Sequence, residues 1–157
     1  MCIRDRPNWC ENRVMISAEK KEDMKEFKKK AFKENKTDGA EIFQFNNLIP
    51  MPEELDIMSG FTNNKEKKKE LEKKQKENVK KYGFKDWYDW RNAKWGTKWD
   101  VEAMTEYEDD KSLEMEFETA WAPPTEVYYH IYKNFPNLEI SWFYHEPGMQ
   151  QAGYLND

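Results

Sequence analysis

Three tryptophans stand among basic residues in the stretch YDWRNAKWGTKWD, residues 88–100. An exposed indole can stack on a nucleic-acid base, and a neighbouring cation can contact a phosphate. The residues that would provide this chemistry are Trp90, Arg91, Lys94, Trp95, Lys98 and Trp99. Aromatic residues at helical spacing are also typical of side chains that bury one another in a small core. General expectation favours the core, and a stacking platform of one or two exposed indoles stays open.

A second candidate surface is acidic. Residues 113–118 alternate between apolar side chains and three glutamates, which are Glu114, Glu116 and Glu118. Between residues 100 and 119, nine acids oppose one lysine, a local charge of −8 that repels phosphates. We therefore expect no RNA binding through this face. It is either a solvated strand face or a surface that meets a basic protein partner or mimics nucleic acid.

A third charged segment has the opposite sign. Residues 63–81 contain nine lysines and four glutamates, a local charge of +5. Three pairs have the order that favours ion pairs one helical turn apart, namely Glu70–Lys74, Glu72–Lys76 and Glu77–Lys81. The pattern predicts a solvated helix that ends at Gly83. Such a helix is usually only a soluble element, although non-specific contact with phosphates is an alternative.

Residue types suited to catalysis or metal binding are sparse. His145 and Glu146 are a candidate acid–base pair, and His130 is expected on a helix, but neither histidine has a recognisable nucleophilic partner. Oxygen ligands for a hard cation are available from Asp100, Glu102 and Glu106, yet the spacing of a calcium loop is absent. We expect a protein that is not an enzyme and has neither a cofactor nor a metal site.

Apolar periodicity predicts the elements that position these groups. A two-residue period predicts strands at residues 12–18 and 138–145, a strand or extended arm at 43–48, and a hairpin within 101–119. A helical period predicts helices at residues 19–35, 63–81, 86–94 and 123–135. We expect the first helix to extend as far as the Asp38-Gly39 turn.

The order strand, helix, hairpin, helix, strand is the βαββαβ pattern of a ferredoxin-like sandwich in the α+β class. It requires residues from about 41 to 100 to be a helical, Trp-rich insertion. A chain of 157 residues suits one domain, which we place at residues 7–157. Charged residues reach 36% and hydrophobic residues only 38%, so the core must depend on the seven Trp, eight Tyr and nine Phe.

The expected cellular compartment is inferred from membrane-spanning, secretory and disulfide features that the sequence does not show. No run of apolar residues approaches the roughly 20 that a membrane-spanning helix needs, and no secretory segment opens the chain. Only Cys2 and Cys10 occur, so a disulfide framework or zinc site is not expected. A cytoplasmic protein that does not contact membranes is predicted, and its oligomeric state is not.

Residues 1–6, MCIRDR, resemble a translated sequencing-adapter remnant, which we exclude from the fold. The rest contains five short motifs in order: PNWCENRV, NLIPMPEEL, WRNAKWGTKWD, TAWAPP and YHEPGM. Together they resemble the YubB-type ferredoxin-like family of plasmid and bacteriophage proteins. The resemblance implies a ferredoxin-like domain from a mobile genetic element and brings no catalytic or binding residues. That family typically continues into a further strand, so the sequence leaves open whether the C-terminal sheet edge is complete.

We therefore expect a non-enzymatic accessory protein of a phage or plasmid, in the cytoplasm of a bacterial host. Its predicted role is to bind a host or element-encoded protein through the acidic face or the insertion. The alternative is nucleic-acid or nucleotide binding through the lysine-rich helix and the Trp-rich insertion.

Overall fold

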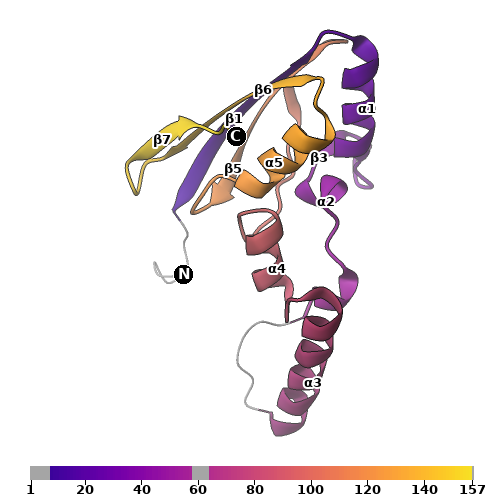
Figure 1. Cartoon of the computed structure of the whole chain (residues 1–157), viewed down its shortest axis with the longest axis vertical. Helices are drawn as coiled ribbons and strands as arrows, with labels where there is room; N and C mark the ends of the chain where they lie inside the picture. The colour runs from indigo at the N-terminus through magenta and orange to yellow at the C-terminus, as the bar shows by residue number, and fades with distance from the viewer. Residues whose placement is uncertain (1–7, 58–63, 157) are drawn as a thin grey trace.

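A computed structural model of the chain describes residues 8–57 and 64–156. The expected adapter remnant at residues 1–6 and the first residue of the predicted lysine-rich helix lie outside the described residues. The fold is α+β: a larger antiparallel sheet with helices on one face, a two-stranded sheet, and a helical arm (Figure 1).

The larger sheet has five strands in the order β4-β5-β1-β6-β7. Their bounds are Trp9–Ala18 for β1, Thr105–Glu108 for β4, Ser112–Ala120 for β5, Leu138–Glu146 for β6 and Gln151–Tyr154 for β7. All neighbours are antiparallel, and β1 lies between β5 and β6. The central position of β1 puts alternate residues of its ten-residue length against the core.

Two amphipathic helices cover one face of this sheet (Figure 1). Helix α1, Lys21–Ala31, buries Met24 and Phe27, as its apolar stripe predicts. Helix α5, Thr125–Asn134, buries Val127 and Ile131. These side chains and the inward residues of the strands form one hydrophobic core.

The prediction that the first helix continues towards Asp38-Gly39 is wrong. Helix α1 ends at Ala31, and the next residues form strand β2, Phe32–Glu34, which pairs with β3, Glu41–Phe43. The Phe32 and Phe43 rings lie 5.8 Å apart, so the strand buries an aromatic pair that a continued helix would leave exposed. Gly39 closes the turn between these strands with a φ of 74°.

The strand or arm predicted at residues 43–48 is also wrong beyond Phe43. Helix α2 occupies Phe45–Leu48, followed by the 3₁₀ helix η2 at Glu53–Leu55. The Asp100 carboxylate accepts hydrogen bonds from the backbone N–H groups of Phe45 (2.6 Å) and Asn46 (3.2 Å). A side chain 55 residues away therefore supplies acceptors for the first turn, which local periodicity does not reveal.

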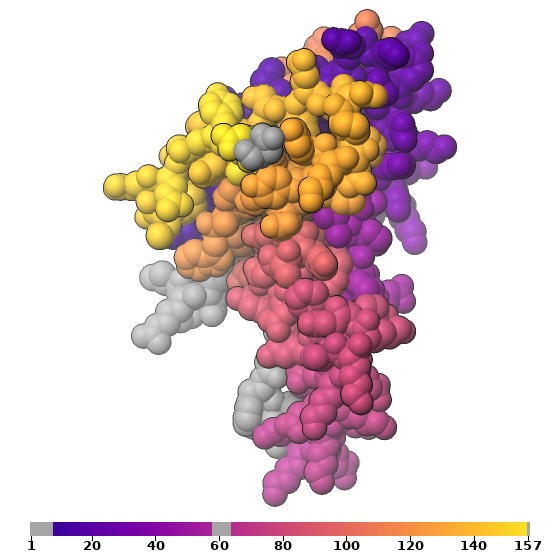
Figure 2. Space-filling view, in the orientation of Figure 1, coloured from indigo at the N-terminus to yellow at the C-terminus, as the bar shows by residue number. Residues whose placement is uncertain are grey.

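Two further helices lie below the sandwich in the view of Figure 1, and the longer one forms the lower end of the molecule. Helix α3, Lys65–Tyr82, begins at Asn64, whose side chain accepts two backbone N–H groups, and ends at Gly83 in the left-handed conformation. Helix α4, Trp87–Lys94, begins at Asp86, whose carboxylate accepts from Asp89 N. The end of α3 at Gly83 and the start of α4 at Asp86 agree with the predicted bounds, whereas the cap at Asn64 was not predicted. Helix α3 projects from the body as an arm (Figures 1 and 2).

The predicted hairpin and last strand are present as β4, β5 and β6, and the sheet continues into β7. Strand β7 pairs with β6 at four positions, from Phe143–Tyr154 to Glu146–Gln151. Its sequence, QAGY, has few strand-favouring residues, so backbone pairing rather than propensity places it in the sheet. Strand β7 therefore forms an edge of the larger sheet beyond β6.

Candidate interaction surface

The face of the sheet opposite α1 and α5 is formed by alternate residues of four strands. On β1, Cys10, Asn12, Val14 and Ile16 point into the core, so the residues between them point outward. We call this surface the open sheet face. It comprises Glu11, Arg13 and Met15 on β1, Glu114, Glu116 and Glu118 on β5, Phe143 and His145 on β6, and Tyr154 on β7.

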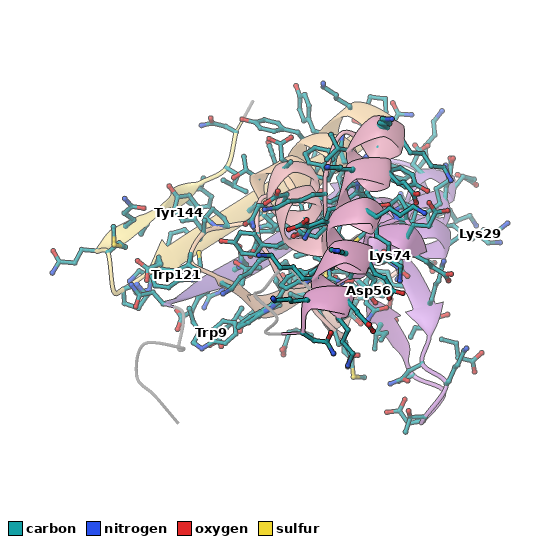
Figure 3. All side chains as sticks on the ribbon, turned by 90° about the horizontal axis from the view of Figure 1, so that it is seen from below. Trp9, Lys29, Asp56, Lys74, Trp121 and Tyr144 are labelled. Carbon is teal, nitrogen blue, oxygen red and sulfur yellow. The ribbon has the colours of Figure 1, made fainter. Side chains whose placement is uncertain are left out.

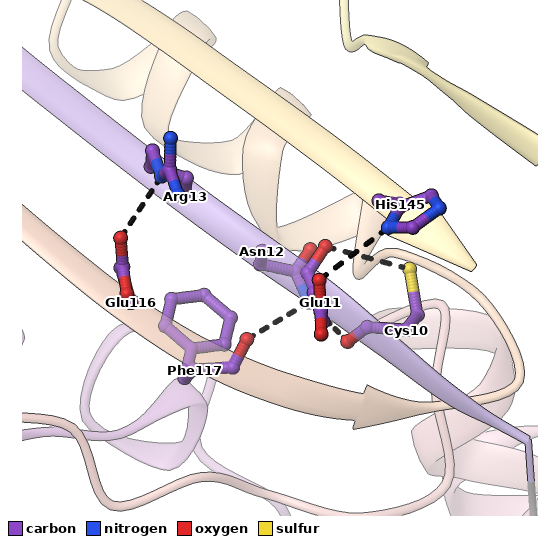
Figure 4. A network of polar contacts seen from close by, with 7 residues as sticks. All are labelled: Cys10, Glu11, Asn12, Arg13, Glu116, Phe117 and His145. Carbon is purple, nitrogen blue, oxygen red and sulfur yellow. Dashed lines mark hydrogen bonds and ion pairs between the residues drawn. The ribbon is translucent and has the colours of Figure 1, made fainter. Parts of the chain in front are cut away.

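The cross-strand register sets the charges of the open sheet face in rows. Glu11 lies opposite Glu118 on one side and His145 on the other. Arg13 lies opposite Glu116, and its Nε is 2.9 Å from Glu116 Oε1 (Figure 4). Arg13 is thus the one arginine among these acids. Both partners are more than half exposed, so the pair contributes little to stability and stays available to a ligand.

Aromatic side chains border the acids. Phe143 contacts Tyr154 at the β6–β7 edge, with ring centroids 5.2 Å apart. At the end of β1, Trp9 lies 5.8 Å from Trp99, and both indoles remain partly exposed. A shallow depression of about 460 Å³ is lined by Glu11, Arg13, Glu106, Glu116, Glu118 and Phe143, among others. The surface therefore combines negative charge with rigid apolar contact area.

A buried polar network supports the open sheet face from beneath. Asn12 Nδ2 donates to Cys10 O (3.1 Å) and Thr119 Oγ1 (3.0 Å), and Asn12 Oδ1 accepts from Trp142 Nε1 (3.0 Å). These bonds join β1, β5 and β6, so neighbouring outward residues are held in a fixed register. Burial raises the pKa of the Cys10 thiol to about 11, which makes it a poor nucleophile.

Most of the tryptophan cluster is core. Trp90 and Trp95 are 5% and 1% exposed, and their rings contact each other edge to face at 5.5 Å. Trp95 Nε1 donates to Ile49 O (3.0 Å), which ties α4 to the segment after α2. The Arg91 guanidinium lies 5.1 Å from the Trp95 ring centroid. The stacking platform is therefore wrong for Trp90 and Trp95, because a base cannot reach their faces.

Three candidate residues of that stretch, Lys94, Lys98 and Trp99, are at least partly accessible. Lys98 Nζ lies 4.4 Å over the ring of Trp99, which is 36% exposed. Lys94 Nζ lies 5.8 Å over the ring of Phe84. Both cations cover apolar rings of their own chain, and Trp99 adjoins the open sheet face through Trp9. In Figure 3, Trp9 and Trp121 lie on the side of the molecule away from Lys29 on α1.

The other candidate groups are separated by the fold. His145 and Glu146 are neighbours on a strand and so face opposite sides of the sheet; Glu146 is buried, whereas His145 Nδ1 lies 3.4 Å from Glu11 Oε2. The proposed acid–base pair is therefore wrong. Asp100 serves as a helix cap, and burial raises its pKa. Among the described residues, no three His, Cys, Asp or Glu side chains are grouped to hold a metal ion.

Helix α3 has the predicted extent but not the predicted ion pairs. Among the salt bridges of the described residues, none joins two side chains of α3. Lys81 instead contacts Glu54 on η2, with Nζ 3.0 Å from Oε1, and this contact raises the pKa of Lys81 and lowers that of Glu54. An exposed pair one turn apart gains only a few tenths of a kcal/mol, roughly 0.3–0.5, so such a pair does not always form.

Sequence reasoning missed Glu11, Arg13 and Phe143 as members of the surface. The alternation of residues 12–18 already puts Arg13 outward, but only the register shows that it meets Glu116. Glu11 was missed because β1 starts three residues earlier than predicted.

Residues 94–156 match the model of a family described as a ferredoxin-like domain in Api92-like protein. The match covers β4, β5, α5, β6 and β7, less than half of the chain, and agrees with the ferredoxin-like part of the expected resemblance. The YubB-type name and the mobile-element origin remain predictions. No curated protein and no solved structure matches the chain. No described helix has the length and apolar character required to cross a membrane.

Proposed function

We propose that this chain is a non-enzymatic protein-interaction module that binds a basic segment of a partner protein through the open sheet face. The observation that supports it best is the placement of Glu11 directly opposite Glu118. Two carboxylates at one cross-strand position repel each other, and a cationic side chain between them would relieve that repulsion.

The chemistry of the face suits lysine and arginine side chains. Acids attract the cations, while Phe143, Tyr154 and Trp9 offer ring faces for cation–π contact. Aromatic residues with restricted rotamers lose little entropy on binding and are frequent at interaction hot spots. Nucleic acid is disfavoured here because phosphates would meet Glu116, Glu118 and Glu11.

We further infer that the chain as a whole has the βαββαβ architecture, built from β1, α1, β4, β5, α5 and β6. The strand order β4-β5-β1-β6 supports this inference, and β7 extends the sheet by one strand. A role as an accessory protein of a phage or plasmid, acting on a host or element-encoded protein in the bacterial cytoplasm, is part of the proposal. It rests on the sequence resemblance.

Affinity capture from nuclease-treated bacterial lysate tests this function. Three baits are compared: the wild type, a sheet variant and a control variant. The sheet variant carries Glu11→Gln, Glu116→Gln and Glu118→Gln, which removes three negative charges and preserves side-chain size. The matched control neutralises three exposed glutamates outside the sheet: Glu19, Glu22 and Glu53.

Proteins retained by the wild-type and control baits but lost by the sheet variant are purified and titrated directly. The proposal expects micromolar or tighter binding that weakens at least tenfold in the sheet variant and falls with salt. Equal binding by all three baits, or partners whose contact segment is acidic, would overturn it.

A further inference from the structure

The charged side chains of α3 are sorted by face. Leu71, Gln75, Asn78 and Tyr82 are its less exposed residues, spaced i, i+4, i+7 and i+11, so they share one side. Asn78 Nδ2 donates to Glu54 O (3.0 Å) and Lys85 O (3.2 Å), which fixes that side towards the body. The opposite side faces solvent along the whole helix.

Five lysines occupy the solvent side in one row, which we call the lysine stripe. They are Lys65, Lys69, Lys73, Lys76 and Lys80, spaced i, i+4, i+8, i+11 and i+15. At about 100° per residue these positions fall within an arc of roughly 80° that contains no glutamate. The stripe runs about 22 Å along the axis at about 1.5 Å per residue. Glutamates flank the arc without entering it.

In the described part of the chain, no salt bridge involves a lysine of the stripe. All five side chains are exposed. Figure 2 shows α3 as a projection clear of the sandwich, so a long ligand can approach it from the solvent side. The open sheet face belongs to the other end of the molecule, and its acids do not shield the arm.

We propose that the lysine stripe binds the phosphate backbone of a nucleic acid without reading its bases. Successive lysines advance about 6 Å along the axis, which presents a regular row of cations to a regular row of anions. A membrane surface fits less well, because an interfacial helix needs a free apolar face and α3 exposes only Val79 among its aliphatic residues. The stripe also has no aromatic residue on which a base could stack.

This inference is independent of the proposed function, since it uses a different element and the opposite charge. If both hold, the chain joins a basic protein at one end to a nucleic acid at the other.

Fluorescence anisotropy with a labelled 30-base-pair DNA duplex and a 30-nucleotide RNA tests the stripe, using the full chain at 50 to 200 mM salt. The stripe variant carries Lys69→Glu and Lys73→Glu. The matched control carries Lys67→Glu and Lys74→Glu, which change the same net charge on the other side of the same helix. Circular dichroism establishes that both variants retain their helix content.

The wild type should bind both probes. If all five lysines contact phosphates, the slope of log K against log salt should reach about −4.5 for the DNA duplex and about −3.5 for the RNA. The stripe variant should lose at least tenfold in affinity, with a slope shallower by about 2, whereas the control stays within about threefold. Equal losses in the two variants would show a general charge effect and overturn the proposal. Two other results would also overturn the proposal. One is that neither probe binds at 50 mM salt, and the other is that phosphatidylserine vesicles, used as a further probe, are the only ligand whose binding depends on the stripe.

Discussion

Glu11 and Glu118 face each other across the β1–β5 pair, and both side chains lie on the open sheet face. Like charges directly opposite one another destabilise a sheet by up to about 1 kcal/mol. Glu11 has a partial remedy in His145, 3.4 Å away, but that residue is cationic only when protonated. Repulsion between the two carboxylates therefore lowers the stability of the free protein. A cation bound between them would remove this destabilisation.

Glu118→Gln should raise the free energy of unfolding by about 0.2–1 kcal/mol at pH 7, because one of the two repelling charges disappears. Urea denaturation followed by fluorescence measures this change. Glu139→Gln is the control, since Glu139 lies opposite Ser17 on the same sheet and has no carboxylate across from it. A stability gain of the same size in both variants would mean that general charge, not the Glu11–Glu118 pair, sets the effect.

Trp95 joins the end of α4 to the segment after α2 through a buried indole. Trp95→Phe should lower the free energy of unfolding by about 2–4 kcal/mol, because it leaves a cavity and removes the hydrogen bond to Ile49 O. Trp121→Phe makes the same replacement at an indole that is 51% exposed, and should change stability by less than about 0.5 kcal/mol. Similar midpoints for the two variants in urea would contradict the burial of Trp95.

What the sequence predicts well is set by local, repeated signals. The stripe of Met24, Phe27 and Ala31 predicts α1, and Gly83 predicts the C-terminal end of α3. These features need only neighbours within a few residues. The candidate glutamates of β5 were recognised in the same way, since alternation alone separates them from Leu113 and Met115.

What the sequence does not predict depends on distant partners. Helix α2 is capped by Asp100, and the short strand β2 forms because Phe32 meets Phe43. The open sheet face as a unit required the register that brings Glu11 to Glu118. The helical spacing of the lysine stripe can be read from the sequence. It was missed because only the net charge of the segment was considered, and a net charge does not show on which side of the helix each residue lies.

Cys10 should be almost unreactive in the folded protein. Its thiol is buried, and its pKa of about 11, against an ordinary value of 9.0, lowers the thiolate fraction roughly a hundredfold at pH 8. In a Cys2→Ser background, reaction with a thiol reagent such as DTNB should be at least a hundredfold slower without urea than in 8 M urea. Fast labelling under native conditions would show that β1 opens or that Cys10 is accessible.

Asp109 holds the β4–β5 turn through its ionised form. Its carboxylate accepts hydrogen bonds from Lys111 N, Ser112 N and the Tyr107 hydroxyl, each 2.8 Å, and these lower its pKa from 3.8 to about 2. A depressed pKa means that the carboxylate stabilises the fold above pH 3.8 and that this stabilisation is lost as the pH falls towards 2.

Carbon-detected NMR of the Asp109 side-chain carboxyl should give a titration midpoint near 2. Asp109→Ala should lower the urea midpoint at pH 6 more than at pH 2.5, because part of the stabilisation by the ionised form is lost at the lower pH. An NMR midpoint near 3.8 would mean that these hydrogen bonds do not persist in solution.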